Sequence, residues 1–128
     1  MDDLLFSVHR VLGYGISVLV LVAAFVAFGR AKNGQEFRSG LYRGALGLLA
    51  LHVVIGIVLY ATRQAWEAAP LIAYVHPILG IVALGAGQAL VGRARRTQMA
   101  ADAHRLAGRG LVVTLVLVLA AIGVASVA

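Results

Sequence analysis

The chain of 128 residues contains no cysteine and few charged side chains. Without cysteine it cannot form disulfide bonds, thiolate zinc sites or cysteine-ligated iron–sulfur clusters. Charged residues make up 12% of the sequence and hydrophobic residues 62%. Soluble domains are nearer about a quarter charged and about half apolar. The composition therefore indicates an integral membrane protein.

Acidic residues are scarce as well, since five face eleven lysines and arginines, for a net charge of +6. A basic balance is one sign of a nucleic-acid partner. Here most basic residues lie in two short segments between apolar runs, so membrane topology explains them better. We expect membrane lipid, and no nucleic acid, around this chain. The N-terminus is acidic, and the apolar run after it is too long for a signal peptide, so it is predicted to be retained.

Four apolar runs cover residues 4–28, 41–61, 70–92 and 104–128. Each is near or above the ~20 residues that a helix needs to cross the hydrocarbon core. Runs of this length must be helices, because backbone polar groups in lipid have to be paired within the segment. The connections are short, which makes consecutive helices antiparallel neighbours. The sequence predicts an all-α fold, a single domain over residues 1–128 that forms an up-down four-helix membrane bundle.

Basic residues predict how this bundle is oriented. Nine lie in the first and third loops and the adjoining helix ends, and only two, Arg10 and Arg63, lie on the other side. Such an excess marks the cytoplasmic side of a membrane protein. We expect a multi-pass protein of a bacterial plasma membrane with cytoplasmic first and third loops and both termini outside.

Each predicted helix carries one histidine, and glycine follows each histidine four positions later. The histidines are His9, His52, His76 and His104, and the glycines are Gly13, Gly56, Gly80 and Gly108. Residues four apart share one face of a helix, so each imidazole has bare backbone one turn along. A flat macrocycle bound through an imidazole needs such clearance. The pattern predicts haem b, with the four histidines as axial ligands of the iron.

Depth in the membrane suggests how the histidines pair. His9 and His76 lie at similar distances from the outer ends of their helices, within ~2 Å at 1.5 Å per residue. They are predicted to bind one iron from opposite faces. His52 and His104 form the second predicted pair, but their depths differ by ~15 Å unless the fourth helix begins earlier, near Gln98. We therefore expect one or two haem groups.

Other interpretations of the histidines stay open. A histidine in a membrane helix also serves as a hydrogen-bonding residue between helices, and this applies most to His104. Three or four imidazoles can bind zinc or copper, which would leave the glycines unexplained. A chlorophyll-type pigment would use one imidazole per ring. Arg105 and Arg109 are further candidates, because a guanidinium group suits a haem propionate, although both also fit a purely topological role.

The first three helices resemble one half of haem A synthase. The segments that carry the resemblance are HRVLGYG, LHVVIGIVLY and YVHPILG, within about 90 residues. It implies that His9 and His76 are axial haem ligands. This chain lacks the second half of that family, and no acidic residue lies near His9 or His76 within the predicted membrane spans.

The last two helices resemble the two-haem transmembrane cytochrome b family that takes electrons from ascorbate. The segments are HPILGIVALGAGQALVG and, after a basic loop, HRLAGRG. This resemblance implies an outer pair, His9 with His76, and an inner pair, His52 with His104. Both families usually have more than four helices.

Together these features predict a small b-type cytochrome that transfers electrons within or across the membrane, alone, as a homodimer or inside a larger redox complex. Two imidazoles on one iron leave no open position, which favours electron transfer over oxygen chemistry. Whether the chain is an enzyme stays open. One alternative is a half-size haem A synthase-like enzyme acting as a dimer. Another is an accessory subunit of a respiratory or photosynthetic complex, without cofactor or with a pigment.

Overall fold

The computed structural model describes residues 2–128, which contain helices and turns but no strand. The helices are α1 (Asp2–Lys32), α2 (Gly40–Thr62), α3 (His76–Arg95) and α4 (Ala100–Val127), with the short helices η1 (Ala65–Glu67) and η2 (Leu71–Val75) between α2 and α3. Counting η2 with α3, four helical segments are long and apolar enough to cross a membrane. The predicted all-α four-helix bundle is confirmed.

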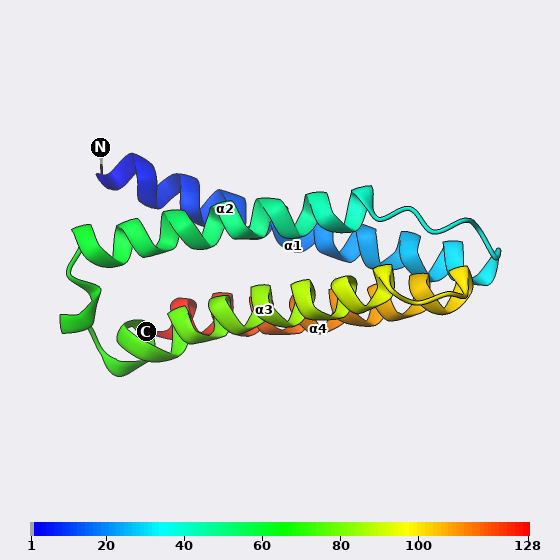
Figure 1. Ribbon diagram of the computed structural model, residues 1–128. Coiled ribbons are helices and arrows are strands. Elements are labelled where there is room, and N and C mark those ends of the chain that lie inside the picture. The colour runs from blue at the N-terminus through cyan, green and yellow to red at the C-terminus, as the bar shows by residue number, and fades with distance from the viewer. Residues whose placement is uncertain (1) are drawn as a thin grey trace.

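Consecutive helices run antiparallel and pack side by side in a ring, with α4 closing against α1 (Figure 1). The backbones of the diagonal pairs, α1 with α3 and α2 with α4, stay apart, although the side chains of Tyr42 and His104 meet across one diagonal. Both chain termini and η1 lie at one end, called here the termini end. The opposite end, called the arginine end, carries the α1–α2 and α3–α4 connections. On and beside these connections lie Arg30, Lys32, Arg38, Arg43, Arg93, Arg95, Arg96, Arg105 and Arg109.

The helices are longer than the apolar runs. Helix α1 continues to Lys32 and α4 already begins at Ala100. Half of the added residues, 29–32 and 100–103, are alanine, which favours helix without being embedded in hydrocarbon. Because α4 begins four residues before the predicted bound, His104 lies about 6 Å further into its helix than expected, at 1.5 Å per residue.

A π-helical turn precedes α3 and is caused by proline. Pro77 has no N–H group and its ring crowds the carbonyl of the residue four positions earlier, so the turn over Leu71–Val75 widens. That carbonyl belongs to Ala73, and it accepts a hydrogen bond from the Tyr60 hydroxyl at 3.0 Å. The turn is thereby tied to α2, and His76 lies at the junction between the π turn and α3.

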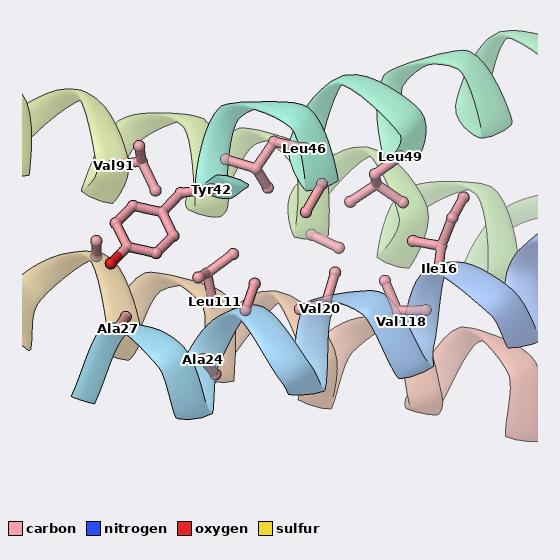
Figure 2. Close-up of a cluster of buried hydrophobic side chains, with 14 of the residues drawn as sticks. Ile16, Val20, Ala24, Ala27, Tyr42, Leu46, Leu49, Val91, Leu111 and Val118 are labelled. Atoms are coloured by element: carbon pink, nitrogen blue, oxygen red, sulfur yellow. The ribbon is translucent and has the colours of Figure 1, made fainter. Parts of the chain in front are cut away.

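A continuous apolar core fills the half of the bundle nearer the arginine end. Figure 2 shows side chains from all four helices pointing toward one another there; Val20, Leu46 and Leu111 have no exposed surface. Toward the termini end, the buried members of this core stop at Ile16, Leu49, Ala83 and Val118. Three of the four histidines, His9, His52 and His76, lie beyond that boundary along their helices.

Gly87 on α3 is required for this core to close. A Cβ atom at this position would lie 2.5 Å from Thr114 Oγ1 and 2.6 Å from Leu46 Cδ2. We expect Gly87→Ala to lower the free energy of unfolding in detergent by about 1–3 kcal/mol, the usual range for overpacking. Gly85→Ala is the matched control, since nothing lies within 4 Å of a Cβ atom there. Equal melting temperatures for the two variants would contradict the packing of α3 against α2 and α4.

Candidate functional site

Three of the four histidines meet inside the bundle, in the half nearer the termini end. His9 comes from α1, His52 from α2 and His76 from η2–α3, and each is partly buried. The ring of His9 lies 4.0 Å from the ring of His52 and 6.2 Å from the ring of His76, centroid to centroid. Residues 43 and 67 positions apart are thus brought into one cluster, called here the histidine cluster.

The two ring contacts of His9 differ in what they permit chemically. His9 and His52 are stacked with an interplanar angle of 2°, whereas the ring planes of His9 and His76 are inclined at 76° and therefore intersect. The lone pair of an imidazole nitrogen lies in the ring plane, so two parallel stacked rings cannot direct lone pairs at one metal ion. Two imidazoles on opposite faces of one ion have centroids about 6 Å apart, because each metal–nitrogen bond is about 2 Å. The contact of His9 with His76 has this separation.

A backbone hydrogen bond holds the ring of His76. Its Nδ1 lies 2.8 Å from the carbonyl oxygen of Ala121 on α4. A carbonyl only accepts, so Nδ1 carries the proton and Nε2 keeps a free lone pair. Metal-binding histidines typically have this arrangement, in which the second ring nitrogen donates to a carbonyl and fixes the tautomer.

The Nδ1 atoms of His9 and His52 are buried and have no hydrogen-bond partner among the described residues. Leaving a polar atom buried and unpaired costs about 1–3 kcal/mol. Two such atoms in one cluster mark it as a place where the protein retains polar side chains at a cost to its stability. Such a cost is typical of functional sites rather than of packing.

His104 lies apart from the histidine cluster, fully buried near the arginine end. Its Nε2 donates to the backbone carbonyl of Glu36 at 3.0 Å, so its Nδ1 accepts from the Tyr42 hydroxyl at 2.7 Å. The Phe37 ring packs beside it, with centroids 4.9 Å apart. Both ring nitrogens are therefore occupied, and the structure does not bring His104 to His52, the partner predicted for a second haem.

The four glycines have different neighbours. A Cβ atom at Gly13 would lie 3.4 Å from His52, and one at Gly56 would lie 3.0 Å from His9, so these two glycines make room for imidazoles. At Gly108 the neighbour is the Phe28 ring, 2.9 Å away. Only Gly80, one turn after His76, has nothing within 4 Å. Clearance for a macrocycle stays a prediction, and Gly80 is where the structure leaves it most room.

The predicted arginines lie away from the histidine cluster. Arg105 and Arg109 are exposed on the first turns of α4, and Arg105 pairs with Asp102 at 3.0 Å. At the termini end, Arg63 pairs with Asp3 at 3.1 Å and lies over the Phe6 ring. Arg105 and Arg109 are therefore placed at the arginine end, on the same helix as His104.

Two features of the site were missed from the sequence. One is the stacking of His52 on His9, for which the repeated His-x-x-x-Gly motif in two antiparallel neighbouring helices was an available signal. The other is the hydrogen bond between Tyr42 and His104, residues 62 positions apart. No local pattern indicates that contact, because it depends on how α2 packs near α4.

Within residues 2–128, no group of three or more histidine, cysteine, aspartate or glutamate side chains is arranged to hold a metal ion by itself. Comparisons with protein-family models, curated proteins and solved structures find no match for this chain. The resemblances to haem A synthase and to the ascorbate-type cytochrome b family therefore stay predictions.

Proposed function

We propose that the protein is a b-type membrane cytochrome in which His9 and His76 are the axial ligands of one haem. The observation that carries the proposal is their approach across the bundle diagonal. Helices α1 and α3 barely touch, yet these two imidazoles lie 6.2 Å apart with intersecting ring planes. That separation suits two imidazoles on one iron.

The surrounding residues fit such a group. The bond from His76 to Ala121 leaves Nε2 of His76 as the nitrogen with a free lone pair. His9 offers an imidazole whose Nδ1 has no partner among the described residues. Gly80 has open space one turn along from His76. The apolar core cluster ends before the histidines, and the rings of His9 and His76 come within 6.2 Å of each other.

Haem b, when bound, supplies reversible one-electron redox chemistry. The chain's own residues would bind and orient it: His9 and His76 would donate nitrogen lone pairs, and the carbonyl of Ala121 holds the ring of His76. In a membrane, the four apolar helices and the surrounding lipid would exclude water from the site. Two histidine ligands would leave a bound iron without an open position, which would favour electron transfer. We place the protein in a bacterial plasma membrane with the arginine end in the cytoplasm, following the excess of basic residues there.

A reduced-minus-oxidised absorption spectrum of the detergent-purified protein, with haem quantified per chain, tests this proposal. We expect sharp low-spin b-type bands and one haem per chain. Two haems per chain would favour the original prediction that His52 and His104 ligate a second, inner haem. Colourless protein from cells grown with sufficient haem would overturn the cytochrome assignment and favour a cofactor-free accessory subunit.

A further inference from the structure

Helices α1 and α2 are joined by a reciprocal contact between two His-x-x-x-Gly motifs. The imidazole of His9 lies against Gly56, and the imidazole of His52 lies against Gly13. Because the two helices are antiparallel, each ring reaches the glycine one turn beyond the other histidine. The two rings are then stacked face to face at 4.0 Å. This contact is called here the His–Gly clasp.

The clasp leaves the His9 ring little rotational freedom. One face of the ring is covered by His52, and its Cε1 edge is 3.0 Å from the position that a Cβ atom at residue 56 would occupy. Only glycine leaves that space open. The ring of His52 is held in the same way, more loosely, since the corresponding distance at Gly13 is 3.4 Å.

His52 cannot share an iron with His9 in this arrangement, because the lone pairs of parallel stacked rings lie in separate planes. Its ring instead lies parallel to the His9 ring and covers one face of it. The plane of the His9 ring stands at 76° to the ring of His76. The angle between two axial imidazole planes governs the electronic structure of a low-spin ferric haem. A residue that fixes the plane of one imidazole therefore also affects the g-values of the iron.

We propose that His52 is a positioning residue: by stacking on His9 within the His–Gly clasp, it fixes the plane of that axial imidazole relative to the His76 ring. This inference rests on the proposed haem ligation by His9 and His76. It assigns to His52 a role other than ligand of a second haem. In this role His52 acts through the flat face of its ring, and its ring nitrogens are not needed to orient His9.

The test compares His52→Phe, which keeps a flat ring, with His52→Leu, which keeps apolar bulk without one. Haem content is measured first, and then the electron paramagnetic resonance spectrum of the ferric form and the midpoint potential. We expect both variants to keep the haem content of the wild type. His52→Phe should keep the wild-type g-values, and His52→Leu should shift or broaden them and change the potential.

Glycine substitutions test the orientation of the His9 ring independently of His52. Gly56→Ala places a Cβ atom 3.0 Å from His9 Cε1, so the ring must move, and we expect the same spectral change as in His52→Leu. Gly47→Ala, on the same helix with nothing within 4 Å, is the matched control and should leave the spectrum unchanged.

Two results would overturn the positioning role. Loss of haem in both His52 variants, with folding retained, would make His52 a ligand. Unchanged g-values and potential in both His52→Leu and Gly56→Ala would show that the clasp does not orient His9. Failure of the underlying cytochrome proposal is distinguishable from either, since it would appear as absence of haem from the wild-type protein.

Discussion

Replacing His76 with glycine is expected to remove the haem signal from the purified protein. The proposed iron loses one axial nitrogen, and no other imidazole is within reach on that side, because His52 is stacked against His9. Haem per chain should fall from one to near zero, measured by the pyridine haemochrome spectrum. His9→Gly should give the same loss, since the two ligands act as a pair.

Adding free imidazole to the His76→Gly variant distinguishes loss of the iron ligand from loss of the fold. The cavity left by His76→Gly is expected to admit free imidazole and to recover low-spin bands on reconstitution with haem. Circular dichroism and size-exclusion chromatography check that the variant remains helical and monodisperse.

Gly80→Ala adds only one methyl group one turn away and serves as a milder probe of clearance, with partial loss of haem expected. Full haem content in His76→Gly would contradict the ligand assignment.

Replacing Tyr42 with phenylalanine is expected to destabilise the bundle without removing the haem. The Nδ1 atom of His104 would lose its only donor in a site with no exposed surface. Leaving one buried polar atom unpaired costs about 1–3 kcal/mol, so the melting temperature in detergent should fall measurably. His104→Ala should cost about 2–4 kcal/mol, because it adds a cavity to the unpaired Tyr42 hydroxyl.

The matched control is Tyr14→Phe, which removes a hydroxyl from an exposed tyrosine and should leave stability unchanged. Combining Tyr42→Phe with His104→Ala should cost less than the sum of the two single changes, since both remove the same hydrogen bond. Haem per chain should match the wild type in every one of these variants. A loss of half the haem in His104→Ala would instead indicate that His104 ligates a second haem.

The two halves of the bundle differ in what fills their interior. Toward the arginine end, small and apolar side chains fill the interior, and the pair Tyr42–His104 ties α2, α4 and the α1–α2 connection together. Past the last residues of this core cluster toward the termini end, three imidazoles lie in the bundle, where Leu59, Ala73 and Ala121 are also buried. A well-packed half therefore holds the helices in place while the other half carries polar groups that reduce stability. The proposed electron-transfer site lies in the second half.

Amino-acid composition and the spacing of apolar runs are enough to predict the class of fold. Hydrocarbon admits only segments whose backbone is paired internally, so four apolar runs with short connections leave the up-down bundle as the expected solution. Depth along a helix follows from residue counting, which places His9 and His76 at similar depths, but their approach to 6.2 Å is a property of the tertiary structure. Helix ends are predicted less well, because alanine and a few charged residues continue α1 and α4 beyond the apolar runs.

Only the tertiary structure decided what each histidine touches. Residue counting gives depth but neither the rotation of a helix about its axis nor its distance from a neighbour, and these place His52 on His9 and His104 beside Tyr42. The same holds for glycine: the sequence shows four equivalent motifs, but packing puts an imidazole against Gly13 and Gly56, a phenyl ring against Gly108 and nothing against Gly80. Side-chain contacts between helices are set by packing across the whole bundle, which no local pattern encodes.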